Sequence, residues 1–167
     1  LVEGSTCPRD RNMNSFSHDL TFKGAFYIPP QYLVTFSQTG LSSDASGPVV
    51  TVNGMPKTFE NLPYSFWIAE NSIVTYSYET TVSSTVSGKR FRLDSVTGPP
   101  SPITVTADTT VTGNYVVQYS MTFDQTGLDE SALNTIVTVD GSGKTYGELP
   151  YSFWVDSGTV VQYAYNS

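Results

Sequence analysis

The sequence contains the hexapeptide Leu62-Pro63-Tyr64-Ser65-Phe66-Trp67 twice, because the same six residues return unchanged at 149–154. Three further segments return at the same offset and without a gap: 31–41 as 118–128, 50–54 as 137–141, and 76–78 as 163–165. A fixed period is the mark of repeated structural units. This period is longer than a propeller blade or a solenoid turn, and it suits a small β-sandwich domain. We therefore predict two copies of one unit, 31–117 and 118–167, preceded by an N-terminal tail, 1–30.

Composition and local patterning both favour strands. Aromatic residues make up 13 % of the chain and charged residues only 14 %, against a usual charged share of about 25 %. The runs 73–78 and 160–165 alternate in polarity, as strands with one buried face do. Asn53-Gly54 and Asp140-Gly141 stand at equivalent positions and supply the positive φ angles of a tight hairpin turn. No helical period extends over a useful length, so the sequence predicts an all-β fold.

The repeated motifs resemble a family of tandem Ig-like repeats in archaeal cell-surface proteins of the S-layer, adhesin or filament type. The resemblance rests on Tyr-x-x-Thr-Phe-x-Gln-Thr-Gly-Leu, on Val-Thr-Val-Asn/Asp-Gly, on Leu-Pro-Tyr-Ser-Phe-Trp, and on the later runs 86–99 and 102–113. It covers about residues 19–167. It implies two tandem Ig-like antiparallel β-sandwich units and a place outside the cell, at its surface. It implies neither catalytic residues nor a cofactor, and a fold alone does not define a function.

The second copy is shorter than the first, which continues beyond Tyr78 through several further strands. Such an incomplete sandwich leaves an unpaired edge, which invites pairing with another chain. The tail segment Thr21-Phe22-Lys23-Gly24-Ala25-Phe26 is similar to Thr110-Val111-Thr112-Gly113-Asn114-Tyr115. The tail therefore looks like the closing strand of a repeat, and the second copy looks like a repeat that lacks one.

We expect the second copy to be completed by strand addition, and the tail of one subunit to complete the second copy of the next. A head-to-tail contact of this kind does not close, so it propagates as a filament. The predicted donor strand contains Leu20, Phe22, Ala25, Phe26 and Ile28. The predicted acceptor groove contains Val137, Val139, Phe153, Val161 and Tyr163. Two alternatives stay open: the chain is a piece of a long repeat array, or the tail folds back on its own subunit.

We expect no enzymatic activity and no metal or cofactor site. Asp156-Ser157-Gly158 is similar to the loop of an aspartic protease, but that chemistry needs two carboxylates that share a proton. The equivalent position in the first copy is Ala69, so the repeat supplies no second acid and we interpret the segment as a hairpin turn. A single His18 and a single Cys7 make a poor zinc site.

The leading functional hypothesis is an extracellular structural subunit that polymerises into a surface filament or pilus. The expected partners are identical subunits, and surface glycans are a further possible partner. The net charge of −7 and the scattered basic residues argue against a nucleic-acid surface, and no apolar run is long enough to span a membrane. The alternative is an adhesin or carbohydrate-binding fragment of a long surface protein. Trp67 and Trp154 would then form a sugar-stacking platform, but their occurrence in both copies favours a place in the core.

Overall fold

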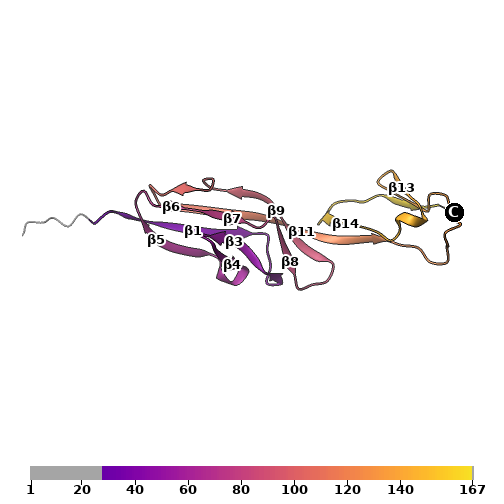
Figure 1. Cartoon of the computed structure of the whole chain (residues 1–167), viewed down its shortest axis with the longest axis horizontal. Helices are drawn as coiled ribbons and strands as arrows, with labels where there is room; N and C mark the ends of the chain where they lie inside the picture. The colour runs from indigo at the N-terminus through magenta and orange to yellow at the C-terminus, as the bar shows by residue number, and fades with distance from the viewer. Residues whose placement is uncertain (1–27, 167) are drawn as a thin grey trace, which may run out of the picture.

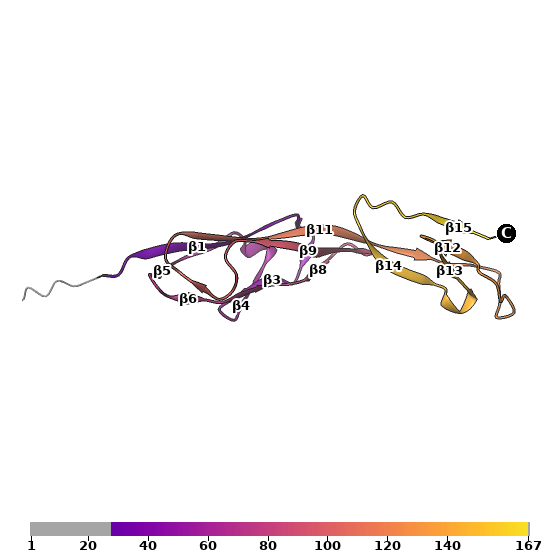
Figure 2. The same ribbon diagram turned by 90° about the horizontal axis from the view of Figure 1, so that it is seen from above.

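The computed structural model describes residues 28–166, and over that range the chain is all-β with two short 3-10 turns. This confirms the fold class predicted from the alternating polarity and the aromatic content. Figure 1 shows an elongated molecule in which the second copy follows the first along the long axis, and the turned view in Figure 2 shows the same arrangement. No helix in the described part of the chain is long and apolar enough to cross a membrane.

Most strands belong to the first copy, and one of them continues into the second. The elements that lie wholly in the first copy are β1 (Gln31–Thr39), β2 (Ala45–Ser46), β3 (Pro48–Val52), β4 (Met55–Thr58), the 3-10 turn η1 (Phe59–Asn61), β5 (Tyr64–Ala69), β6 (Ile73–Val74), β7 (Tyr76–Tyr78), β8 (Thr81–Ser84), β9 (Lys89–Thr97) and β10 (Ile103–Thr104). The remaining elements are β11 (Thr109–Phe123), β12 (Val137–Val139), β13 (Ser142–Lys144), the 3-10 turn η2 (Tyr146–Glu148), β14 (Tyr151–Asp156) and β15 (Tyr163–Tyr165).

The largest sheet has the strand order β2-β8-β9-β11-β1-β5, and β14 also pairs with β11. Two smaller sheets complete the first copy, with the orders β4-β3-β7 and β10-β6. The second copy adds one three-stranded sheet, β13-β12-β15. Most neighbours are antiparallel, but β1 and β11 pair in parallel. The order of the elements repeats, because β3, β4, η1, β5 and β7 correspond to β12, β13, η2, β14 and β15.

The two predicted hairpin turns are present. Asn53 and Gly54 have φ angles of 48° and 79°, and they join β3 to β4. Asp140 and Gly141 have φ angles of 44° and 80°, and they join β12 to β13. Two successive positive φ angles match the twist of a two-residue hairpin, and Asn-Gly and Asp-Gly are the pairs that adopt them at least cost.

The main core lies in the first copy, between the large sheet and the sheet β4-β3-β7. Val34 and Phe36 of β1 are fully buried, because alternate residues of a strand face the same side of the sheet. Its buried residues are Val34, Phe36, Val49, Val50, Val52, Val74, Tyr78, Val82, Phe91, Ile103, Val105, Val111 and Tyr115. The second copy has a much smaller core, which consists of Phe123, Val137 and Val139 with half-buried neighbours.

The strand β11 crosses the boundary that the repeat predicts at 117/118. Its first half pairs with β1 on one side and with β9 on the other. Its second half pairs with β14, from Gln118↔Asp156 to Phe123↔Tyr151. The closing strand of the first copy and the opening strand of the second are therefore one continuous strand.

One predicted strand is shorter than expected. The alternating run 160–165 is a strand only from Tyr163, whereas its counterpart in the first copy also forms β6 at 73–74. The reason is pairing, because β6 is bonded to β10 through Ile103↔Val74. The described part of the second copy contains no counterpart of β10, so 160–161 has no strand to pair with.

A charged cluster fastens the outer edge of the large sheet. The carboxylate of Asp44 accepts hydrogen bonds from the hydroxyls of Ser42 and Ser84, and it pairs with Lys89 Nζ at 2.9 Å. These hydrogen bonds, that of Ser42 first, hold the pKa of Asp44 well below its ordinary value of 3.8. The cluster thus links the segment before β2 to β8 and β9.

We predict that Asp44 makes the stability of the protein depend on pH in the acid range. Its pKa is lower in the folded than in the unfolded chain, so its ionised form stabilises the fold above the ordinary value of 3.8. That stabilisation is lost as the pH falls through the lowered folded-state pKa. Thermal unfolding followed by circular dichroism between about pH 5 and pH 2 should show a steeper loss of stability in the native chain than in Asp44→Asn. Parallel pH profiles for the two chains would contradict the prediction.

Candidate functional site

The parallel contact between β1 and β11 closes the first copy. The register runs from Val34↔Thr109 to Thr39↔Asn114, and Phe36 lies opposite Val111. Both of these side chains are fully buried. The neighbour on the far side of β1 is β5, and Phe36 stacks on Phe66 with ring centroids 6.5 Å apart. The first half of β11 therefore seals the core at an edge of β1 that would otherwise be open.

A tyrosine–glycine contact fixes how β11 lies against β1. The hydroxyl of Tyr78 lies 2.6 Å from the carbonyl oxygen of Ser37 and 3.0 Å from that of Val111, so it donates to both strands. Burial raises the pKa of Tyr78 to about 12. The ring covers Gly113, where an added Cβ would lie 2.5 Å from Tyr78 Cδ1. Only glycine fits at this position of β11.

The second copy reproduces one side of this contact. Phe123 stacks on Phe153 with ring centroids 6.2 Å apart, as Phe36 does on Phe66 in the first copy. The hydroxyl of Tyr165 donates to the carbonyl oxygen of Asp124 at 2.9 Å, as Tyr78 does to Ser37. The second copy thus contains the counterparts of β1 and of Tyr78, namely the second half of β11 and Tyr165.

The other side of the contact is open in the described part of the second copy. On one edge, β11 pairs with β14 as far as Phe123. On the other edge, β9 ends with Tyr119↔Lys89, and Ser120 N donates to Gly88 O at 2.8 Å. On this second edge, no strand of the described residues pairs with 121–126. We call this open stretch the edge groove.

Side-chain exposure shows what the edge groove lacks. Tyr78 is 6 % exposed, whereas its counterpart Tyr165 is 49 % exposed. Tyr163 is 61 % exposed, although its counterpart Tyr76 is half-buried. Two large aromatic side chains therefore face solvent at positions where the first copy covers them with its closing strands.

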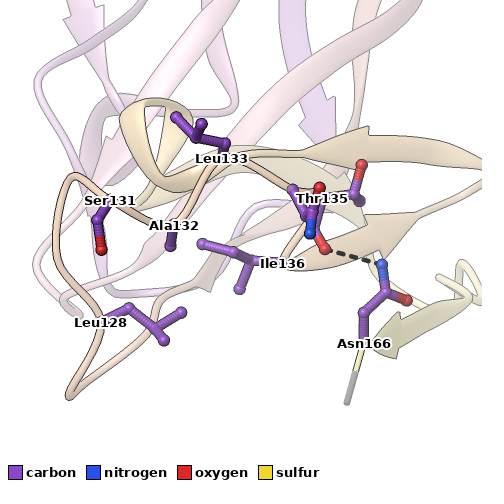
Figure 3. Close-up of a pocket in the computed structure, with 8 residues that line it drawn as sticks. Leu128, Ser131, Ala132, Leu133, Thr135, Ile136 and Asn166 are labelled. Atoms are coloured by element: carbon purple, nitrogen blue, oxygen red, sulfur yellow. Dashed lines mark hydrogen bonds between the residues drawn. The ribbon is translucent and has the colours of Figure 1, made fainter.

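A hollow of about 590 Å³ lies in the second copy, beside the loop that follows β11 (Figure 3). Its lining comes from the loop 128–136 and from Asn166, whose Nδ2 donates to the carbonyl oxygen of Thr135 at 2.8 Å. The equivalent loop of the first copy contains β2, which pairs with β8 through Ala45↔Ser84. That loop of the first copy also lines a hollow, which is smaller, at about 210 Å³.

The five predicted acceptor residues do not share one environment. Val137 and Val139 are buried in the small core. Phe153 and Val161 are half-buried against that core, and Tyr163 is exposed. The donor residues Leu20, Phe22, Ala25 and Phe26 lie outside the described residues, and Ile28 is exposed.

Sequence reasoning missed the residues that define the edge groove. Met121, Asp124 and Tyr165 were not among the predicted acceptors, and neither was the loop 128–136. The signal for Tyr165 was present, because the repeat pairs it with Tyr78. The residues along the groove edge could be identified only once the parallel pairing of β1 with β11 was known, and the repeat alone does not reveal that pairing.

The prediction that the two tryptophans lie in the core was wrong. Trp67 is 62 % exposed and Trp154 is 37 % exposed. In β5 and β14 the inward positions belong to the neighbouring Tyr and Phe residues, so the tryptophans point outward. Trp154 is partly covered because the guanidinium of Arg90 lies 4.2 Å from its ring centroid.

Asp156 belongs to a polar junction between the copies. Its carboxylate accepts hydrogen bonds from Arg92 Nη2 at 2.8 Å and from Gln118 Nε2 at 2.7 Å. The hydrogen bond from Arg92 is the main reason why the pKa of Asp156 lies below its ordinary value of 3.8. β14 ends at Asp156 and a turn follows, which agrees with the interpretation of 156–158 as a turn. Within residues 28–166, no group of three His, Cys, Asp or Glu side chains is placed to hold a metal ion.

We predict that Gly113→Ala lowers the free energy of unfolding by ~1–3 kcal/mol, because the added methyl group collides with the Tyr78 ring. Gly147→Ala is the matched control, since its Cβ would meet no atom within 4 Å. That change should alter stability by less than about 1 kcal/mol. Urea unfolding followed by tyrosine and tryptophan fluorescence measures both. Equal effects of the two substitutions would contradict the assigned role of Gly113.

No protein-family model, curated protein or solved structure matches this chain. The first copy is therefore the reference against which the second is understood. The described part of the second copy differs from the first in two exposed tyrosines, an unpaired edge and a larger hollow.

Proposed function

We propose that the protein is an extracellular structural subunit that polymerises head to tail into a surface filament by strand complementation. In this proposal, 31–117 and 118–167 are two Ig-like β-sandwich units. The donor is the segment 20–28 of one subunit, and the acceptor is the edge groove of the next. The observation that carries the proposal is the unpaired edge beside 121–126, which in the first copy holds a parallel strand.

The apolar surface of the second copy supports strand addition. Tyr163 and Tyr165 are exposed beside a core of only three buried residues. An added strand would pair with the edge of 121–126 that faces away from β14, and it would remove these rings from water. Main-chain hydrogen bonds supply affinity in such additions, and side-chain pockets supply specificity.

The shape of the molecule supports linear growth. β1 begins near one end of the long axis, and β15 lies near the other (Figures 1 and 2). The start of β1 and the strand β15 are thus far apart. A contact between such distant surfaces of two identical subunits is heterologous, and it propagates instead of closing into a dimer.

Negative-stain electron microscopy of the native chain tests the proposal. We expect filaments from the native chain and none from Phe22→Asp, because Phe22 corresponds to the fully buried Val111. Phe16→Asp is the matched control, since Phe16 lies outside the donor segment, and it should form filaments normally. Monomers from the native chain would contradict polymerisation and would favour a piece of a repeat array. Unchanged filaments from Phe22→Asp would contradict the role of the donor segment.

The exposure of Trp67 favours a second candidate, an adhesin or carbohydrate-binding function. Its indole is 62 % exposed, whereas Arg90 partly covers Trp154. If Trp67 binds sugars, titration with a panel of neutral oligosaccharides should change the tryptophan fluorescence of the native chain and of Trp154→Ala, but not of Trp67→Ala. The same response in all three chains would contradict this function.

A further inference from the structure

The first copy defines the kind of strand that its edge accepts. Three alternate residues of β11 face the core: Val111 is fully buried, Gly113 lies under the Tyr78 ring, and Tyr115 is 5 % exposed. The strand runs parallel to β1. The required pattern is therefore an apolar residue, then glycine two positions later, then an aromatic residue two positions after that.

The second copy presents the same recognition elements without an occupant among the described residues. Phe123 corresponds to Phe36, which lies opposite Val111. Tyr165 is held in place by its hydrogen bond to Asp124 O at 2.9 Å. Its ring is half exposed, and the place that Gly113 takes beside Tyr78 is open.

The sequence contains the required pattern twice. One instance is Val111-Thr112-Gly113-Asn114-Tyr115, which already serves the first copy. The other is Phe22-Lys23-Gly24-Ala25-Phe26 in the tail, and none of the remaining glycines has an apolar residue two positions before it and an aromatic residue two positions after it. The tail is therefore the one segment of this chain that fits the edge groove.

Charge favours the same register. In the first copy, Ser37 lies opposite Thr112, and both side chains are neutral. The equivalent pair in the docked arrangement is Asp124 with Lys23. Opposite charges on neighbouring strands stabilise their pairing, whereas a register shifted by one residue turns every side chain to the wrong face.

We propose that the edge groove selects the tail of a second copy by this pattern, in parallel orientation, with Phe22 beside Phe123, Lys23 beside Asp124 and Gly24 against the Tyr165 ring. The inference rests on the proposed strand complementation and adds its register and its specificity. Gly24 is the residue that determines specificity, because a side chain there would collide with Tyr165 as one at Gly113 collides with Tyr78.

Disulfide trapping in a Cys7→Ser background tests the register. Thr21 is expected beside Thr122, as Thr110 is beside Thr35, so Thr21→Cys with Thr122→Cys should give a ladder of cross-linked oligomers on a non-reducing gel. Thr21→Cys with Ser120→Cys is the shifted control, and its cysteines would be too far apart to bond. A ladder of equal yield from the control would overturn the register.

A second comparison tests the role of Gly24. Adding Gly24→Ala to the Thr21/Thr122 cysteine pair should lower the cross-linking yield roughly tenfold. The same addition should have little effect when Tyr165→Leu removes the ring. An unchanged yield with Gly24→Ala and intact Tyr165 would overturn the glycine rule.

Electron microscopy of the Cys7→Ser parent separates the two proposals. Filaments together with a ladder from the shifted pair would overturn the register and leave polymerisation standing. A disulfide between Thr21→Cys and Thr122→Cys inside a monomeric chain, without filaments, would support the register but would contradict polymerisation and overturn the second copy as the source of the tail. Filaments with a ladder from the Thr21/Thr122 pair alone would support both.

Discussion

The parallel pairing of β1 with the first half of β11 is the interaction on which the rest of the structure depends. It closes the main core, and it brings Gly113 under Tyr78, whose hydroxyl reaches the main chains of both strands. The Tyr78 hydroxyl, which contacts both strands, and the Tyr78 ring, which leaves room only for glycine, set the register together. Since β11 continues as the opening strand of the second copy and pairs there with β14, one strand is shared by both copies.

The same pairing explains why two similar sequences reach different states. Both copies contain the stacked phenylalanine pair, the hairpin turn and the capped 3-10 turn. Among residues 28–166, only the first copy has strands beyond its tyrosine, and those strands bury Val82, Phe91 and Val111. In the second copy, Tyr163 and Tyr165 are exposed, because no such strands cover them in the described residues. Local sequence is therefore enough for strands and turns, while the core depends on the closing strands.

Much of the fold could be predicted from the sequence, because alternation and turn chemistry are local. The all-β class and both hairpin turns are confirmed. The outward tryptophans were not foreseen, because aromatic character indicates burial without indicating which face of a strand is inside. The fusion of two strands into β11 was also not foreseen, since alternation does not say whether adjacent runs end or continue. For the candidate site, the repeat pointed to an incomplete second copy. Identifying the residues along its open edge required knowledge of the strand pairing, which the sequence does not give.

Side chains from the first copy bind residues of the second copy at the junction between them. Arg90 and Arg92 of β9 reach past their own copy to Trp154 and Asp156 of β14, and Gln118 lies buried between them. The first copy has Ala69 where the second has Asp156, and the described residues place no arginine over Trp67. An aspartate is useful at this position only where a preceding β9 supplies its arginine. A continuous strand with an arginine–aspartate pair beside it resists bending between the copies more than a flexible linker would, and such stiffness suits the filament that we propose.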